Sequence, residues 1–501
     1  MIAGALMIAT IAPLTIGART FTHPGLSYTE TDLQRMRKGI QEKNGQMAAT
    51  FEALKASPWS RTDLSESTPV TAIGETQFNN YVGRDGRRVH DLALLYRLTD
   101  DTAYADQAVR ILNRYKDLTN CSARGTAPLD NGKIYLMIEG AELLRDYPGW
   151  ADADRQDFAD MLVYPGYSST AFPDGHRDAY DDEANDITFY WNIYNFDTGR
   201  FGNQGLFAAR AMMAMGIFLD NEKMYDRAMN YLMSRPARED DLPYSNLVPT
   251  RGSLRSESES MRDYNVTWAE GDSQFISDEA LQYYIYSNGQ CQEACRDQGH
   301  TLVGVGLYTD LAEMSKNQGD DLYGALDSRI LRGLEYACRY NLGEGDPTGY
   351  SKDENDCTFD NGIFYQADSR SQRWEAIAPA AGDRGAFDCV RYLTQALMHY
   401  SNRVDLAADD YQWLEKAWQK CVAENAGGIE DWGEAAHFYE WKGWGTLTKW
   451  EPKQTQTSAP AITAEISGAR YYDLNGVRVA EPKNGIYVKV QNNTAKITVV
   501  D

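Results

Sequence analysis

Three segments of the chain repeat one pattern of hydrophobic and polar positions: an apolar helix, a short polar turn, and a second helix that opens near a tyrosine. They read DLALLYRLTDDTAYADQAVRILNRY, ARAMMAMGIFLDNEKMYDRAMNYLM and VGVGLYTDLAEMSKNQGDDLYGALDSRILRGLEYACRY. The spacing from Leu98 to Tyr104 equals that from Leu219 to Tyr225. Apolar residues that recur every three to four positions on both sides of a turn predict helical hairpins.

The two helices of a predicted hairpin differ in polarity. The stretch LFAARAMMAMGIFL, from Leu206 to Leu219, is apolar nearly all round, whereas its partner is amphipathic. Strand-like alternation is almost absent before residue 460, which excludes a doubly wound or sandwich core. Apolar inner helices and amphipathic outer helices predict a mainly α fold, an α/α barrel or toroid.

The pattern changes near the C-terminus. Residues 451–463, EPKQTQTSAPAIT, have the composition of a linker, which places the α domain at 19–450. The segment ARYYDLNGVRVAEPKNGIYVKVQNNTAKITVVD then alternates around Asn475-Gly476 and Asn484-Gly485, two predicted hairpin turns. We therefore expect a small β module at 464–501. Its motifs YYDLNGVRV and KNGIYV resemble the C-terminal modules of exported Bacteroidota proteins.

Composition narrows the possible partners. With 501 residues, 43% of them hydrophobic, the chain can bury one large core and a small second one. The 73 acidic and 49 basic side chains give a net charge of -24, which argues against nucleic acid as a partner. The seven cysteines form no CxxC pair and are expected to be small buried hydrophobes. No metal-binding motif is present, so we expect no metal and no other cofactor.

The first 18 residues, MIAGALMIATIAPLTIGA, are apolar and end in small residues before Arg19, which is typical of a signal peptide. A membrane anchor is the alternative, but a span needs about 20 apolar residues, and Pro13 and several threonines interrupt this run. No other stretch is long and apolar enough to cross a bilayer. We expect a secreted or periplasmic protein with no membrane span in the mature chain.

The densest set of ionisable residues lies between Asn288 and Gly324, in NGQCQEACRDQGHTLVGVGLYTDLAEMSKNQGDDLYG. On one helix, Glu293, Arg296 and His300 would share a face, because they are three and four residues apart. A carboxylate, a guanidinium and an imidazole are then expected to converge on one spot.

A second polar helix head occurs in RFGNQGLFAARAM, where Asn203 and Gln204 precede an apolar inner helix. Inner helices of a toroid run roughly parallel, so both polar heads are expected to open on the same rim. Free backbone N–H groups and the helix dipole favour a bound anion there. Asn203, Gln204, Arg296 and His300 therefore form a candidate site for a carboxylate.

These motifs resemble the alginate-lyase-type polysaccharide lyases, a family of α/α toroids that cleave uronic-acid polymers. The resemblance is carried by GNQGLFAARAMMAMGIFLDNEKMYDRA and by the 288–324 stretch, and more weakly by AELLRDYPGW near residue 145 and GWGTL near residue 445. Such an enzyme removes the C5 proton of a uronate and expels the C4 oxygen, which requires a carboxylate neutraliser, a base and an acid.

The resemblance implies a role for each candidate. Asn203 would neutralise the substrate carboxylate with help from Arg296, and His300 would be the base. Two positions depart from the family pattern: Gln204 follows Asn203 where better-known members have His, and His300 stands where they have a catalytic Tyr. The acid would then come from elsewhere, with Tyr264 and Tyr194 as candidates.

Other residues are candidate substrate contacts. Lys133 and Tyr135 enter a helix in DNGKIYLMIEGAELL, and Trp191 in WNIYNF has a ring that could stack on a sugar. Gln204, Glu293 and Gln298 complete the set, with Glu293 expected to orient Arg296.

The sequence favours a lyase that depolymerises an anionic polysaccharide, alginate first and glucuronan second. One alternative is a hydrolase on a similar barrel, which needs two carboxylates about 5 to 9.5 Å apart, with Glu293, Asp272 and Glu375 as candidates. It leaves His300 and Asn203 unexplained. A non-catalytic glycan-binding protein is the other, and it predicts no clustered Arg and His. Linkage preference, endo or exo action and oligomeric state stay open.

Overall fold

The computed structural model describes two compact units, Met1–Glu451 and Pro452–Asp501. The described residues are 19–74, 77–121, 127–171, 187–196, 203–244, 279–285, 289–291, 293, 298–342, 392–424 and 442–451, with the backbone of short strands between 358 and 374 and between 470 and 500. The candidates Arg296 and Tyr264, and the predicted signal peptide at 1–18, lie outside them.

The first unit is built from helices. The longer ones are α1 (Glu30–Gln41), α2 (Gly45–Ala56), α3 (Arg84–Thr99), α4 (Thr102–Leu112), α6 (Tyr135–Leu143), α7 (Asp152–Val163), α9 (Gln204–Phe218), α10 (Glu222–Leu232), α12 (Gln298–Asn317), α13 (Ala325–Asn341) and α15 (Gln412–Glu424). The shorter ones are α5 (Ala127–Gly132), α8 (Phe189–Ile193), α11 (Leu281–Tyr284), α14 (Leu393–Met398) and α16 (Gly445–Thr448), with 3-10 turns η1 (Pro58–Ser60) and η10 (Ala408–Asp410) and π-helical turns η3 (Asn79–Gly83) and η9 (His399–Arg403).

The strands that the structure describes in this unit are two residues long. They are the parallel pair β1 (Ala72–Ile73) and β2 (Asn120–Cys121), and the antiparallel pairs β3 (Thr358–Phe359) with β4 (Gly362–Ile363) and β5 (Gln366–Ala367) with β6 (Arg373–Trp374). Such short ladders build no core, so the predicted mainly α class is confirmed.

Asp and Asn residues make the predicted hairpin turns. Between α3 and α4, Asp100 takes a left-handed conformation (φ 58°), and the Asp101 side chain accepts a hydrogen bond from the Ala103 N–H at 3.0 Å. Between α9 and α10, Asp220 does the same (φ 53°), and the Asn221 side chain accepts from the Met224 N–H at 3.1 Å. Each pair ends one helix and caps the next, which explains why the two turns share one spacing.

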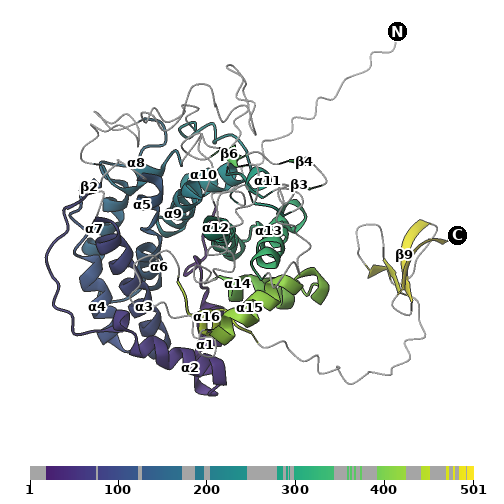
Figure 1. Cartoon of the computed structure of the whole chain (residues 1–501), viewed down its shortest axis with the longest axis horizontal. Coiled ribbons are helices and arrows are strands. Elements are labelled where there is room, and N and C mark those ends of the chain that lie inside the picture. The colour runs from purple at the N-terminus through teal and green to yellow at the C-terminus, as the bar shows by residue number, and fades with distance from the viewer. Residues whose placement is uncertain are drawn as a thin grey trace, which may run out of the picture. The chain divides into compact units, whose positions relative to one another are not determined.

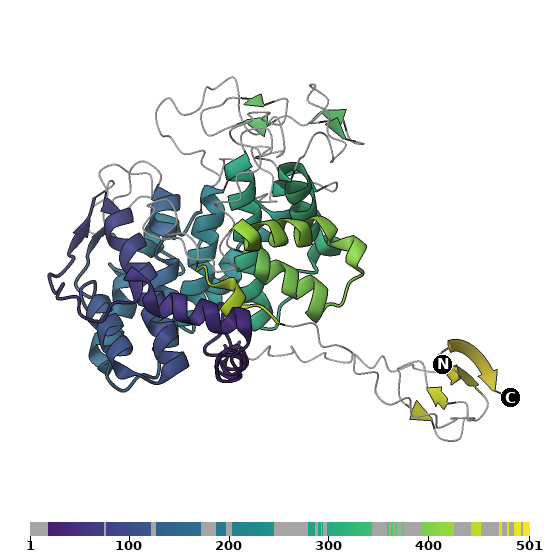
Figure 2. The same cartoon turned by 60° about the horizontal axis from the view of Figure 1, so that its bottom comes forward.

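The helices form a closed ring with two layers (Figures 1 and 2). Buried helices α3, α6, α9, α12 and α14 each pack against the next one in this order, while α4, α10, α13 and α15 lie against their hairpin partners. Helix α16 packs on α14 and on α1 and α2, and these two pack on α3, which closes the circle. The predicted α/α toroid is confirmed.

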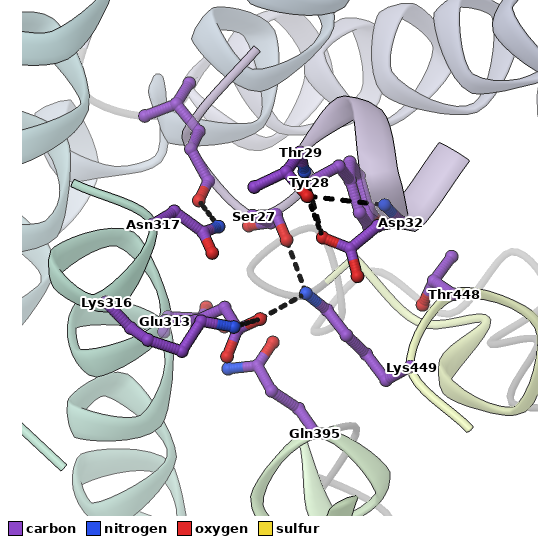
Figure 3. A network of polar contacts seen from close by, with 12 residues as sticks. Ser27, Tyr28, Thr29, Asp32, Glu313, Lys316, Asn317, Gln395, Thr448 and Lys449 are labelled. Carbon is purple, nitrogen blue, oxygen red and sulfur yellow. Dashed lines mark hydrogen bonds and ion pairs between the residues drawn. The ribbon is translucent and has the colours of Figure 1, made fainter. Parts of the chain in front are cut away.

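A buried polar cluster holds the two ends of the ring together (Figure 3). The Lys449 ammonium donates to the Glu313 carboxylate at 2.8 Å and to the Ser27 carbonyl, so residues from both ends of the unit are tied to α12. Arg403 and Lys316 also pair with Glu313, at 3.1 and 2.9 Å. Burial opposes ionisation, but these three cations hold the pKa of Glu313 well below its usual value.

The second unit is a four-stranded antiparallel sheet in the order β10-β9-β7-β8, from β7 (Arg470–Tyr472), β8 (Arg478–Val479), β9 (Gly485–Gln491) and β10 (Thr494–Val500). The hairpin predicted at Asn475-Gly476 is found, since β7 pairs with β8. The one predicted at Asn484-Gly485 is wrong, because β9 pairs with β7 and β10, not with β8. The pairing of Gln491 with Thr494 instead leaves a two-residue connection at 492–493.

Two further expectations concern single features. Cys121, Cys291, Cys338 and Cys421 are buried, as expected of small hydrophobic side chains. Among the described helices, none combines the length and the apolar character needed to span a bilayer.

Candidate active site

Asn203 stands at the head of α9 without capping it. Its backbone is already helical (φ -81°, ψ -9°), so its carbonyl accepts the Phe207 N–H at 3.0 Å while its side chain makes no capping bond. The residue is only 5% exposed, and its side-chain amide bonds to no described residue. A nearly buried amide with its hydrogen-bonding groups unused is expected to have a ligand or water as its partner.

Gln204 adds a second amide beside it. It is half-buried, and its Oε1 atom is buried without a hydrogen-bond partner. Because the first backbone N–H groups of α9 and its dipole point the same way, the helix head combines side-chain donors with a positive local potential. The head of α9 is therefore suited to a carboxylate.

Close packing fixes this head in place. A Cβ atom at Gly132, the last residue of α5, would lie 2.7 Å from the Phe207 carbonyl oxygen, so α5 and α9 touch at a glycine. A Cβ atom at Gly205 would lie 2.7 Å from the carboxylate of Glu279. Glu279 is fully buried and accepts from the Tyr231 hydroxyl. Sequence reasoning missed Glu279, since no motif surrounds it.

A buried ion cluster joins α9 to α12. The Arg210 guanidinium pairs with Asp310 at 2.7 Å, and Lys442 pairs with the other oxygen of the same carboxylate at 2.5 Å. Burial would raise the pKa of Asp310, but Lys442 and Arg210 lower it below its usual value. Glu279 contacts both helices: its carboxylate lies against Gly205 of α9, and its carbonyl accepts from the Tyr308 hydroxyl of α12. Arg210 and Asp310, which pair with each other, both come later in their helices, and this order is expected of parallel helices. Both polar heads then lie toward the same side.

His300 lies in the first turn of α12 and is half-buried. Glu293 lies outside α12 as the structure describes it, in a 3-10 turn, so the prediction that it shares a helix face with His300 is not supported. Before it, Ile285 and Cys291 form an antiparallel β-bridge around Gly289, whose φ is +94°. A positive φ favours glycine at position 289. Glu293, four residues later, is fully buried.

Gln298 links two helices. Its Oε1 accepts from the Asn341 amide at 2.8 Å, and the two residues are 1% and 3% exposed. The start of α12 is thereby fixed to the end of α13, and Gln298 supports the head rather than presenting its side chain on a surface.

The two α5–α6 candidates have partners within the protein. Tyr135 is fully buried, and its hydroxyl bonds to Ser27 at 2.7 Å, Glu139 at 3.1 Å and Lys442 at 3.1 Å. This corrects the expectation of a substrate contact, since no part of Tyr135 is open to a sugar. Lys133 is 7% exposed and bonds to Asn79 and Asp130.

Trp191 and Tyr194 belong to an aromatic cluster at α8. Trp191 is fully buried with its ring centroid 4.7 Å from that of Tyr190, so no face is free for a sugar ring and the stacking expectation is corrected. Tyr194 is 2% exposed, and the Arg227 guanidinium lies 5.3 Å from its ring centroid. These contacts explain both side chains by packing.

Metal binding has no support in the part of the chain that the structure describes. No group of three or more His, Cys, Asp or Glu side chains there could hold an ion.

The chain is similar to several known proteins. Solved structures that resemble it include an alginate lyase from Bacteroides ovatus (12% identity, TM-score 0.46, covering 86% of this chain and 100% of that one). Another is alginate lyase A1-III from Sphingomonas species A1 (13% identity, TM-score 0.45, covering 84% and 95%). A variant of alginate lyase A1-III complexed with a tetrasaccharide also matches (12% identity, TM-score 0.35, covering 70% and 95%).

Among curated proteins, no match to this chain was found. The model of one protein family matches part of the chain. The matched part includes the polar head of α9 but not that of α12. Residues 38–242 match the model of the alginate lyase family.

Proposed function

We propose that this protein is a polysaccharide lyase that depolymerises a uronic-acid polymer by β-elimination, with alginate as substrate and glucuronan as the second candidate. The match of residues 38–242 to alginate lyases supports the reaction class. The observation that carries the proposal is the pair of side-chain amides at the N-terminus of α9. Asn203 is nearly buried, Gln204 has a buried oxygen, and neither side chain has a hydrogen-bond partner within the described structure.

In the proposed reaction, the Asn203 amide donates hydrogen bonds to the carboxylate of the sugar. These bonds strengthen when removal of the C5 proton makes that carboxylate enolate-like, so they stabilise the transition state more than the ground state. Gln204 and the first N–H groups of α9 add to the same field. Arg296, outside the described residues, is proposed as the charged partner of the carboxylate.

His300 is proposed as the base. The neutral imidazole of the half-buried His300, in the first turn of α12, takes the C5 proton, the C4–O4 bond breaks, and a C4–C5 double bond forms. The departing O4 takes a proton from a tyrosine. We propose Tyr264 for this role and Tyr194 as the second candidate. The contacts of Tyr194 with Trp191 and Arg227 make it the weaker of the two.

The test is ultraviolet absorbance of the new double bond during incubation with alginate, glucuronan and neutral polysaccharides. A lyase produces the chromophore, a hydrolase produces only reducing ends, and a binding protein produces neither. Asn203→Ala and His300→Ala are each expected to lower kcat by at least roughly 100-fold. Gln156→Ala, which removes an exposed amide, is the matched control and should leave kcat unchanged. Full activity in both site variants would refute the assignment.

Export is part of the proposal. The predicted signal peptide at 1–18 and the C-terminal sheet support a secreted or periplasmic location. N-terminal sequencing of protein recovered outside the cytoplasm is expected to begin at Arg19, and recovery only from the cytoplasm with Met1 intact would contradict it.

A further inference from the structure

A cavity of about 560 Å³ lies between α13 and α15, and the candidates Asn203, His300 and Tyr194 are not among the described residues that line it. Its walls come from α13, α15 and the η10 turn, which lie together in green in Figure 1. Sites for small molecules typically occupy about 300–1,000 Å³, so this cavity is large enough for a ligand.

A carboxylate from one helix fixes the geometry of the cavity. Glu335 on α13 accepts the backbone N–H groups of Trp413 at 3.1 Å and Leu414 at 2.8 Å. The first turn of α15 is thereby held against α13, and Trp413 becomes part of the wall. Its half-buried indole has the Arg339 guanidinium 5.7 Å and the Lys416 ammonium 4.0 Å from the ring centroid.

The lining mixes groups that a saccharide needs. Arg332 and Arg339 are donors, Glu335 and Asp410 are acceptors, and Trp413 offers an aromatic surface. The arginines can pair with the carboxylate of a uronate, and the acids can accept hydrogen bonds from its hydroxyls. Sugar hydroxyls both donate and accept, and the C–H faces of a sugar ring pack on aromatic and aliphatic groups, so a hydroxyl-rich ring fits this lining best.

The backbone at one edge of the cavity is strained, and exposed apolar side chains lie close to lining residues in the sequence. Leu326, Asp327 and Ser328 have consecutive φ values of 51°, 59° and 54°, which non-glycine residues rarely adopt, and the last two line the cavity. Backbone strain of this kind concentrates at functional sites. Of the three large hydrophobic side chains exposed in the described residues, Leu326 (38%) and Val404 (48%) lie within two positions of lining residues.

We propose that this cavity is a second saccharide-binding site, which holds a segment of the polymer away from the catalytic rim. The identity of that polymer rests on the proposed function. Because the polymer would be held at two places, its effective concentration at the catalytic rim rises without any change in the chemical step.

The state of Glu335 agrees with such a ligand. Burial raises its pKa to about 7, although the N–H groups of Leu414 and Trp413 oppose the shift. Near neutral pH the carboxyl group therefore exists in both its protonated and its ionised form. The protonated form can donate a hydrogen bond to a hydroxyl oxygen, whereas the ionised form can only accept one.

The test uses native electrophoresis through gels that contain alginate, in the Asn203→Ala background so that the polymer is not cut. The parent is expected to be retarded. Adding Trp413→Ala, or Arg332→Ala at a half-exposed position where truncation leaves the fold intact, should weaken binding roughly three- to tenfold. Trp418→Ala on the same helix, whose indole donates to Thr394 outside the cavity, is the matched control and should not change retardation.

Kinetics give a second measurement in the active protein. Trp413→Ala and Arg332→Ala are expected to raise KM for the polymer by the same factor while kcat and tetrasaccharide cleavage stay unchanged. The inference is overturned if the parent is not retarded, or if both variants keep its retardation and KM. Retardation without any chromophore from the wild-type protein would overturn the proposed function alone.

Discussion

At the scale of single residues, the amide of Gln204 tests whether the α9 head receives a carboxylate. Gln204→Glu keeps the size of the side chain but places a negative charge beside Asn203. We expect kcat/KM on alginate to fall roughly 100-fold, because like charges at close range cost several kcal/mol. Gln156→Glu, an exposed site with the same charge change, is expected to behave as wild type. Equal kinetics for both variants would mean that no anion binds at Gln204.

His23 gives a residue-scale prediction about pH. Its ring contacts Glu142 at 2.6 Å and Asp220 at 2.9 Å, and the bond to Glu142, against burial and Arg145, raises its pKa above 6.5. A raised folded-state pKa means that this stabilisation is complete below the unfolded value and is lost as pH rises through the folded value. We expect wild type to exceed His23→Gln in Tm at about pH 5.5, with a smaller difference at about pH 8.5. A Tm difference that does not depend on pH would contradict this.

At the scale of elements, the sequence predicts helices well where local signals decide. Apolar periodicity and the residues Asp100, Asp101, Asp220 and Asn221 locate two hairpins, because a left-handed Asp and a capping side chain act within a few residues. The head of α12 fails for the opposite reason. The spacing of Glu293 and His300 places them on one face only if both belong to one continuous helix. Glu293 instead follows the β-bridge between Ile285 and Cys291 and lies outside α12.

Burial of polar aromatic residues also escapes sequence reasoning. Tyr135 resembles a subsite residue because it follows Asn131 and Lys133, but its hydroxyl bonds to Ser27 and to Lys442, 108 and 307 positions away. Partners this distant leave no local pattern. Three candidates lie at a helix head in the structure: Asn203, Gln204 and His300. Their position depends only on where an apolar run begins.

The link between α9 and α12 gives an element-scale prediction. Asp310→Asn removes the charge that Arg210 and Lys442 share, and leaves two buried cations facing an amide. We expect the free energy of unfolding to fall by about 3–5 kcal/mol in urea titrations. Asp152→Asn, whose carboxylate is almost fully exposed, should change it by less than about 0.5 kcal/mol. A small effect at Asp310 would show that the core tolerates the unpaired cations.

At the scale of the whole molecule, acidic side chains outnumber basic ones, 73 to 49. The chain carries a net charge of -24, which would repel a polyanion at long range. Ionic strength screens such repulsion beyond about 10 Å, so the field at the α9 head decides local binding. Raising salt from low to physiological levels is therefore expected to speed association with alginate, in contrast to a basic enzyme. Stopped-flow measurement of kcat/KM against salt checks the sign, and a fall with added salt would contradict it.

The closed ring depends on Glu313, which three cations share. Lys449→Met leaves Arg403 and Lys316 in place, so we expect a loss of about 2 kcal/mol in the free energy of unfolding. Glu313→Gln leaves all three cations without a counter-charge, and about 3–5 kcal/mol should be lost. Lys55→Met, which breaks an exposed pair, is the control and should cost less than about 0.5 kcal/mol.

The double variant separates a shared network from independent contacts. If Lys449 acts mainly through Glu313, Lys449→Met with Glu313→Gln should cost less than the sum of the two single changes, because Lys449→Met removes a cation that Glu313→Gln leaves unpaired. The depressed pKa of Glu313 means that its stabilisation is present above the unfolded value and is lost as pH falls through the folded value. Wild type and Glu313→Gln should therefore converge in acid. Strict additivity, or a gap that survives in acid, would show that the ends of the ring are held by packing alone.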